Sequence, residues 1–238
     1  MLGKAHPALA VVAPPRLARF REARGTFAER AILLDNVPAP AGRPAASLRF
    51  GSDQKLYAVF DDGGDAKNGG DLASYGGKIL RLNPDGTTPQ DQPGGSPLYA
   101  DAVRSPRGMD WQPATGALWI ADAVSDRLEH LTLVANRDAP RMSRVVTAKY
   151  ALPSSAGVAS MVFYRGAAVP ALQGDLLLAA AEGGYILRLQ FDRRDASRLV
   201  ASERLLEDRL GPVRALGISL GGEIYFCTPD ALGRLLPP

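Results

Sequence analysis

The chain has 238 residues, of which 46% are hydrophobic and 22% charged, a balance typical of a soluble globular protein with a sizeable core. Its longest apolar runs, such as residues 176–181, are far shorter than the ~20 residues that cross a bilayer, so no membrane span is predicted. The formal net charge is +3 and acidic residues lie among the basic ones, which does not indicate a nucleic-acid partner. Cys227 is the only cysteine, which excludes an intramolecular disulfide and multi-cysteine metal sites.

Turn-forming residues are frequent along the chain, with 25 glycines and 19 prolines, and they indicate many short elements. Residues 17–20 resemble the last strand of a unit whose beginning is absent. Residues 195–210 are compatible with a helix or with a pair of strands, and we expect little helix elsewhere. The clearest predicted strands, in chain order, are Leu56–Phe60, Lys78–Leu82, Leu118–Ala121, Leu176–Ala180, Tyr185–Leu189 and Glu223–Cys227.

Two strand types repeat in alternation. The first is a turn followed by large apolar residues, and its equivalent positions are Tyr57, Trp119, Leu177 and Tyr225, roughly 50 to 60 residues apart. In the second, arginine alternates with apolar residues, as at residues 77–82 and 184–189. A period of this size with several strands per interval is typical of β-propeller blades and predicts about four of them. A β-sandwich with similar turns is the alternative fold.

Four segments resemble a known family: Leu-Arg-Phe-Gly-Ser-Asp-Gln-Lys-Leu-Tyr at 48–57, Gly-Gly-Lys-Ile-Leu-Arg-Leu-Asn-Pro-Asp-Gly at 76–86, Arg-Ser-Pro-Arg-Gly at 104–108 and Trp-Gln-Pro-Ala-Thr-Gly-Ala-Leu-Trp at 111–119. In these the chain resembles the soluble pyrroloquinoline quinone (PQQ)-dependent glucose/sorbosone dehydrogenases, which include the aldose sugar dehydrogenases. Members of that family are six-bladed propellers. The resemblance therefore implies an all-β fold in which residues 1–238 form a single partial β-propeller domain, without the first blades and with residues 1–16 poorly ordered.

The resemblance also implies a chemistry, the oxidation of an aldose or similar alcohol with hydride transfer to PQQ. Such a site needs a general base, a calcium ion and arginines that hold the cofactor. Arg43 occupies the position of the family's catalytic histidine, and a guanidinium cannot accept a proton at neutral pH. Asp62 falls on the aspartate that orients that histidine. The two histidines of the chain, His6 and His130, align elsewhere, and we expect a structural role for His130.

Other family positions are kept in part. Arg104 and Arg214 match cofactor-binding arginines. Val124 and Ser125 replace a Gly-Pro turn whose backbone carbonyls hold calcium, and Glu182 replaces a basic residue that pairs with the cofactor. Because Glu182 would repel a carboxylate of the cofactor, we expect PQQ to bind weakly if at all. Residues 61–65, with the sequence Asp-Asp-Gly-Gly-Asp, do not have EF-hand spacing and are interpreted as a solvated turn.

Three functions remain open on these residues: a PQQ-dependent sugar dehydrogenase, a propeller that binds a sugar or a protein without redox chemistry, and a truncated, inactive family member. An open blade edge on the N-terminal side predicts self-association of the chain. The family resemblance implies a periplasmic or secreted protein. Residues 1–15 lack the features of a secretory signal, however, which predicts a cytoplasmic location for the chain as written.

Overall fold

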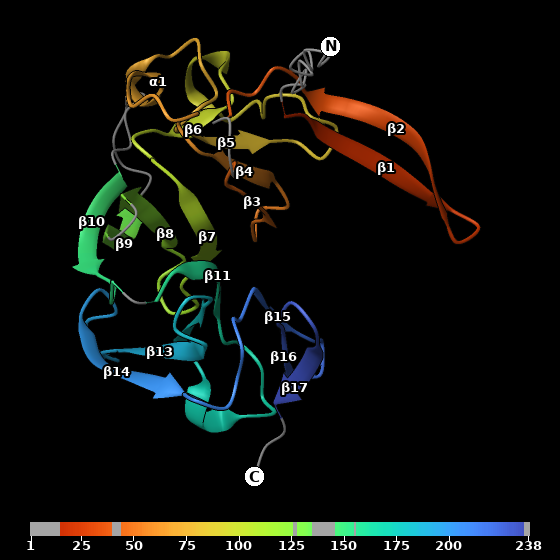
Figure 1. Cartoon of the computed structure of the whole chain (residues 1–238). Coiled ribbons are helices and arrows are strands. Elements are labelled where there is room, and N and C mark those ends of the chain that lie inside the picture. The colour runs from red at the N-terminus through yellow and green to blue at the C-terminus, as the bar shows by residue number, and fades with distance from the viewer. Residues whose placement is uncertain (1–14, 40–43, 126–127, 135–145, 155, 236–238) are drawn as a thin grey trace, which may run out of the picture.

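A computed structural model describes residues 15–39, 44–125, 128–134, 146–154 and 156–235. Short antiparallel sheets follow one another around an open arc (Figure 1). In the described part of the chain, helix is confined to α1 (Lys67–Gly70) and the 3-10 turns η1 (Pro93–Gly95) and η2 (Pro170–Leu172). The predicted all-β propeller with about four blades is therefore confirmed.

Each blade is an antiparallel meander, with its strands side by side in chain order. One four-stranded blade contains β3 (Ala46–Phe50), β4 (Leu56–Phe60), β5 (Ile79–Leu82) and β6 (Leu98–Ala100). The next contains β7 (Pro106–Trp111), β8 (Leu118–Ser125), β9 (Leu128–Val134) and β10 (Val146–Ala151). The third contains β11 (Val158–Phe163), β12 (Leu176–Ala180), β13 (Tyr185–Phe191) and β14 (Leu199–Leu205). A three-stranded sheet follows, with β15 (Ala215–Ile218), β16 (Ile224–Cys227) and β17 (Leu232–Leu235).

A two-stranded hairpin of β1 (Leu17–Ala23) and β2 (Thr26–Leu34) precedes these blades and extends away from them (Figure 1). The prediction that residues 17–20 form the last strand of a unit is corrected by this hairpin, because β2 lies between them and β3. Leu17 pairs with Leu34 at the base of the hairpin, and both side chains are buried. Both belong to one hydrophobic cluster with residues of β4 and β5, so the base of the hairpin packs on the first four-stranded blade.

The hydrophobic core lies between successive blades rather than inside any one of them. Trp119 of β8 and Met161 of β11 belong to one interblade cluster, and Tyr57 and Met109 belong to the cluster before it. All five residues of β12 are buried, because one face of the strand packs on the preceding blade and the other on the following one. The first strand type, in β4 and β12, is therefore buried on two sides, which explains its continuous apolar run.

The first strands of the blades contact one another around the inside of the arc: β3 contacts β7, β7 contacts β11, and β11 contacts β15. Gly108 of β7 allows this close approach, because a Cβ atom at this position would lie 2.7 Å from the side chain of Met161. The ends of these inner strands therefore meet around a common centre, and side chains far apart in the sequence gather at each end of the blades.

The predicted strands are present with small changes in their ends. The strands at Leu56–Phe60 and Leu176–Ala180 have the predicted bounds, β5 begins one residue late, and β8 and β13 continue two or more residues further. Residues 195–210 contain the single strand β14, which pairs with β13, and so form neither the helix nor the strand pair. No described helix is long and apolar enough to cross a membrane.

The recurring arginine of the second strand type has a defined role. In three blades it lies on the third strand and forms an ion pair with an acidic residue just before or at the start of the second strand. The pairs are Arg81–Asp53 at 2.9 Å, Arg188–Asp175 at 2.6 Å and Arg234–Glu223 at 2.8 Å. The side chains of Arg81 and Arg188 are largely buried and are held within their blades, whereas that of Arg234 is 46% exposed.

Candidate active site

A cleft of about 620 Å³ lies at the end of the blades where β7 and β11 begin and where β8 ends. Its polar and charged lining comes from different blades: Arg107 on β7, Ser125 at the end of β8, Glu129 on β9, Glu182 in the turn after β12, and Arg214 just before β15. Three of these residues, Ser125, Glu182 and Arg214, are predicted site residues, and the fold brings them together.

Sequence reasoning missed two residues of the cleft, Arg107 and Glu129. Arg107 is the second arginine of the Arg-Ser-Pro-Arg-Gly segment at 104–108, in which only the first arginine, Arg104, matches a family position. Glu129 lies next to His130 on β9, and adjacent residues of a strand point to opposite faces of the sheet. Strand alternation was the signal that could have selected Glu129. His130 itself is half-buried within β9, opposite Asp122 of β8.

Glu129 is a buried carboxylate fixed by the backbone. Both of its carboxylate oxygens accept the N–H of Val158, each at 3.0 Å, and only 8% of the residue is exposed. Burial raises the pKa of Glu129, the Val158 hydrogen bond and the nearby Arg107 guanidinium act in the opposite direction, and the Glu182 carboxylate raises it further. Gly157, at φ 54, lies against the Glu182 side chain, where a Cβ atom would clash.

Asp62 and Arg104, predicted to orient the base and to hold the cofactor, contact each other. Arg104 Nε lies 2.6 Å from Asp62 Oδ2, and the Asp62 backbone N–H donates to the Arg104 carbonyl at 2.9 Å. Asp62 is 4% exposed, and its other carboxylate oxygen accepts the N–H of Gly64 at 2.9 Å. The arginine offsets the charge of the buried aspartate as an ion pair, but the described residues give Asp62 Oδ2 no hydrogen bond.

Two further buried carboxylates support this region. Asp122 accepts the backbone N–H groups of Arg104 and Ser105, the latter at 2.7 Å, and burial raises its pKa. Asp61 accepts the N–H groups of Ala45 and Gly63, and burial raises its pKa as well. The prediction of a solvated turn at residues 61–65 is therefore wrong for its first two residues. Their carboxylates are buried because each one bonds backbone N–H groups that the turn leaves unpaired.

The described residues do not fit a calcium site. Ser125 is the last residue of β8 and pairs with Leu128 of β9, and Val124 precedes it in the same strand, so their backbone is extended. The described part of the chain contains no group of three or more Asp, Glu, His or Cys side chains that could hold a metal ion. In the loop after β4, the buried Lys78 ammonium donates to the carbonyls of Asn68 and Gly76, so a side-chain cation binds the carbonyls there.

The cleft does not fit PQQ well either. PQQ carries three carboxylates, whereas the cleft offers two arginines, Arg107 and Arg214, together with two carboxylates, Glu129 and Glu182. The side chains of Arg107 and Arg214 have no hydrogen-bond or ion-pair partner among the described residues. Arg104, the other arginine expected to bind the cofactor, is paired with Asp62. The predicted base position, Arg43, lies outside the described residues, and its neighbours Pro44 and Ala45 line the cleft. A nearly balanced set of charges favours a neutral polar ligand over a trianion.

The fold and the cleft together define a β-propeller with a polar site at one end of its blades. Residues 12–136 and 131–237 match the family model described as Glucose / Sorbosone dehydrogenase, and the chain belongs to this family. Among curated proteins, quinoprotein glucose dehydrogenase B of Acinetobacter calcoaceticus is 28% identical over 117 residues, which is 40% of this chain and 24% of that protein.

Solved structures of related enzymes share the fold. The PQQ-bound aldose sugar dehydrogenase of Streptomyces coelicolor superposes with a TM-score of 0.73 at 20% identity, over 91% of this chain and 66% of that chain. The soluble aldose sugar dehydrogenase of Escherichia coli, in its apo form, gives a TM-score of 0.77 at 18% identity, over 92% and 72% of the two chains. The chain thus spans about a quarter of the curated relative and about two thirds of these structures.

Proposed function

We propose that this chain is a sugar-binding member of the glucose/sorbosone dehydrogenase family that does not oxidise its ligand. The observation that carries the proposal is the ion pair between Arg104 and Asp62. It joins the position expected to bind the cofactor to the position expected to orient the base. With Arg43 at the position of that base, the family's proton acceptor is replaced by a permanent cation.

The remaining groups of the cleft suit the hydroxyl groups of a neutral sugar. Arg107 and Arg214 supply hydrogen-bond donors that have no side-chain partner in the described part of the chain. Glu182 supplies an acceptor, and Ser125 can donate or accept. A volume of about 620 Å³ is in the range of small-molecule sites. The binding of PQQ and calcium, which the family implies, is expected to be weak at best. A periplasmic or secreted location remains a proposal from the family resemblance.

Titration of the purified chain with glucose and other neutral aldoses, followed by calorimetry, tests the binding proposal. Replacing Arg214 by alanine removes charged hydrogen-bond donors, and we expect it to weaken binding by about tenfold. Arg209→Ala is the matched control, because Arg209 is exposed and does not line the cleft. Absence of binding by every aldose, or equal affinity in both variants, would overturn the proposal.

Oxidation of a sugar by PQQ is the second candidate function, and membership of the family favours it. The two candidate functions are distinguished by the reduction of an electron-accepting dye. A protein that binds the sugar without oxidising it leaves the dye unreduced. A sugar-dependent reduction of the dye by the unmodified chain would favour the dehydrogenase over the binding protein.

A further inference from the structure

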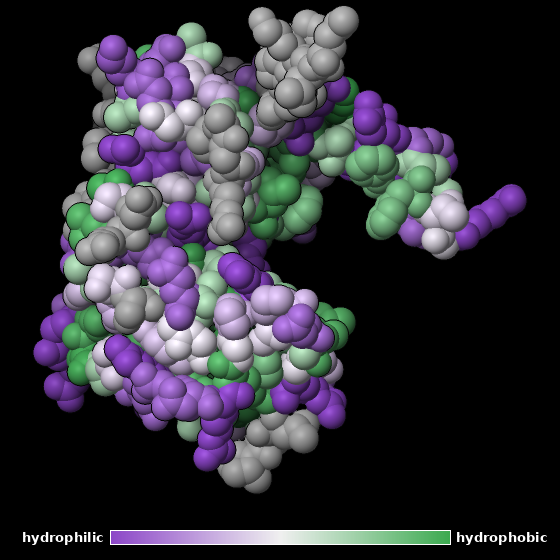
Figure 2. Space-filling view, in the orientation of Figure 1, coloured by the Kyte–Doolittle hydropathy of each residue, from purple (hydrophilic) through white to green (hydrophobic). Residues whose placement is uncertain are grey.

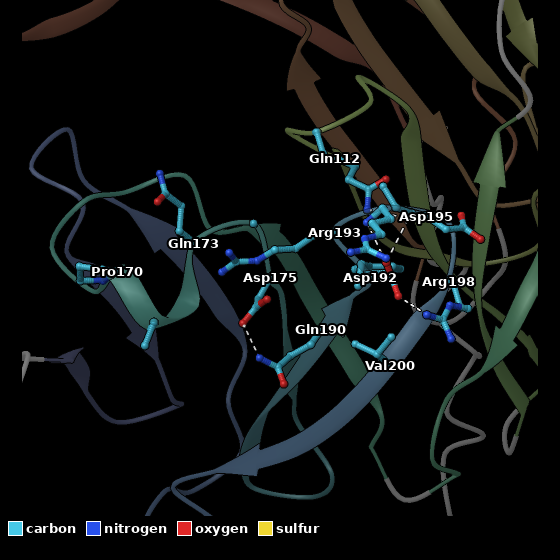
Figure 3. Close-up of a pocket in the computed structure, with 16 residues that line it drawn as sticks. Gln112, Pro170, Gln173, Asp175, Gln190, Asp192, Arg193, Asp195, Arg198 and Val200 are labelled. Carbon is cyan, nitrogen blue, oxygen red and sulfur yellow. Dashed lines mark hydrogen bonds and ion pairs between the residues drawn. The ribbon is translucent and has the colours of Figure 1, made fainter.

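A second and larger cleft, of about 810 Å³, lies at the opposite end of the blades, where β7 and β13 end and where β12 begins (Figure 3). On one side are η2 and the residues that follow it, among them Gln173, Asp175 and the nearby Gln190. On the other side is the turn between β13 and β14, from Asp192 to Arg198. None of the site residues predicted from the family lines this cleft.

The turn from Asp192 to Arg198 is held in a fixed shape by its own acidic residues. Asp192 Oδ1 accepts the N–H of Arg194 at 2.7 Å and that of Asp195 at 3.2 Å, and Asp192 Oδ2 pairs with Arg198. Asp195 in turn accepts both the N–H and the hydroxyl of Ser197, at 3.1 and 2.7 Å. The hydrogen bonds of Asp192, together with Arg198, lower the pKa of Asp192, so its carboxylate remains charged at neutral pH.

The neighbouring blade fixes the same turn in space. Gln112, after β7, donates from its side chain to the Ala196 carbonyl at 2.6 Å. Tyr150 of β10 donates its hydroxyl to the Ser197 carbonyl at 2.6 Å and accepts the N–H of Leu199 at 2.9 Å. The turn is therefore positioned by two blades, and a ligand would not have to order it on binding.

This cleft is lined by three aspartates and three arginines, but the arginines differ in whether they have a partner. Arg198 is paired with Asp192, the Asp175 carboxylate is paired with Arg188 at 2.6 Å, and the Asp195 carboxylate bonds Ser197. Arg193 and Arg194 are exposed, and neither side chain has a hydrogen-bond or ion-pair partner among the described residues. Two guanidinium groups that make no ion pair with a described residue stand on a fixed turn, where they can bind an anion through paired N–H donors.

The opposite wall supplies groups for hydroxyls. Gln173 is exposed, and its amide has no hydrogen-bond partner among the described residues. Gln190 makes only a long contact of 3.5 Å with Asp175, so its carbonyl oxygen can accept another hydrogen bond. The cleft is also far larger than a single inorganic anion requires. We propose that it binds an anionic saccharide, a sugar that carries a carboxylate or a phosphate, with the acidic group on Arg193 and Arg194.

The test uses the full chain and four probes: gluconate, glucose 6-phosphate, glucose and inorganic phosphate. Binding is measured by calorimetry, and the site is located by chemical shift changes of the backbone amides at residues 190–198. We expect gluconate or glucose 6-phosphate to bind at least tenfold more tightly than glucose and inorganic phosphate. The double variant R193Q/R194Q should weaken that binding at least tenfold.

Two control variants test whether a loss of affinity is specific to Arg193 and Arg194. Arg209→Gln removes an exposed arginine outside the cleft and should leave the affinity unchanged. R107Q/R214Q alters the first cleft and should also leave it unchanged. Four results would overturn the proposal. Inorganic phosphate or glucose could bind equally tightly with shift changes at residues 190–198, or the R193Q/R194Q variant could be unaffected. The fourth is a loss of affinity in R107Q/R214Q alone, which would place the ligand in the first cleft.

Discussion

Arg104 Nε lies 2.6 Å from the buried carboxylate of Asp62, and the Asp62 backbone N–H bonds the Arg104 carbonyl. The two residues thus hold each other through both side chain and main chain. The Arg104 side chain is 45% exposed, so solvent screens the ion pair and its contribution to stability is modest. The pair also joins the two positions that the family resemblance assigns to cofactor binding and to orientation of the base.

The loop that carries Arg104 depends on Asp122. Replacing Asp122 by alanine leaves the N–H groups of Arg104 and Ser105 without their acceptor, and we expect a loss of roughly 1–4 kcal/mol in the free energy of unfolding. Asp122→Asn keeps one acceptor oxygen and should cost less. Urea unfolding of the three proteins measures both differences, and equal stability of the alanine and asparagine variants would contradict this account.

Glu129 gives a prediction for the dependence of stability on pH. Because burial raises the pKa of Glu129 in the folded protein, the folded state binds its proton more tightly than the unfolded state does. This carboxylate therefore lowers the stability as the pH rises from its unfolded pKa through its folded pKa. Glu129→Gln keeps an oxygen for the Val158 N–H and removes the buried charge.

We expect Glu129→Gln to be at least as stable as the unmodified chain at pH 7, with an advantage that shrinks as the pH falls below the folded pKa. Urea unfolding at pH 7 and near pH 4 gives the comparison, and Asp230→Asn, at an exposed position outside the cleft, is the control. A stability advantage of Glu129→Gln that grows as the pH falls would contradict this prediction.

The apolar face of the β1–β2 hairpin predicts self-association. Ala18 is opposite Ile32 and Glu22 is opposite Phe27, so strand alternation places Phe20, Phe27 and Ile32 on one face. Phe27 is 83% exposed and its ring contacts Phe20 edge-on, and Figure 2 shows apolar residues along the extended hairpin. A two-stranded sheet with such a face is marginal alone and tends to acquire a partner.

We expect a second copy of the chain to cover this face, with dimers or larger species at tens of micromolar, about the range of weak association. Sedimentation velocity over a concentration series measures it. Phe27→Ser should shift the distribution towards the monomer, whereas Leu220→Ser, at an exposed leucine in the turn before β16, should not. A clean monomer of the unmodified chain throughout the series would contradict the prediction.

Glu182 gives a prediction for cofactor affinity. Its carboxylate lines the first cleft, where the family resemblance places a basic residue that pairs with PQQ. Glu182→Arg replaces repulsion by attraction, and we expect it to raise the affinity for PQQ by about tenfold or more. Absorbance titration with PQQ and calcium measures the change. Asp230→Arg, an equal change of charge at an exposed position outside the cleft, should have little effect, and a similar gain in both variants would show only a long-range charge effect.

Much of the fold could be predicted from the sequence because the blades repeat. Tyr57, Leu177 and Tyr225 each pair across the sheet with the arginine of the next strand, so a turn, a buried strand and an arginine recur with one geometry. The hairpin before β3 was harder to predict, because arginines and glutamates interrupt the apolar pattern of β1 and β2.

The site could be predicted less completely. The positions of Glu182 and Arg214 follow from aligned motifs, and both line the first cleft. That Arg104 pairs with Asp62 follows only from the fold, since the two residues come from separate loops. The second cleft had no signal in the family motifs, because its arginines lie in a turn that those motifs do not include.

The most direct test of the central claim is sugar-dependent dye reduction by the unmodified chain, saturated with PQQ and calcium and supplied with a series of aldoses. The account predicts no reduction above a blank of PQQ and calcium without protein, while the same preparation still binds an aldose by calorimetry. Saturable, sugar-dependent reduction of the dye by the unmodified chain would contradict it.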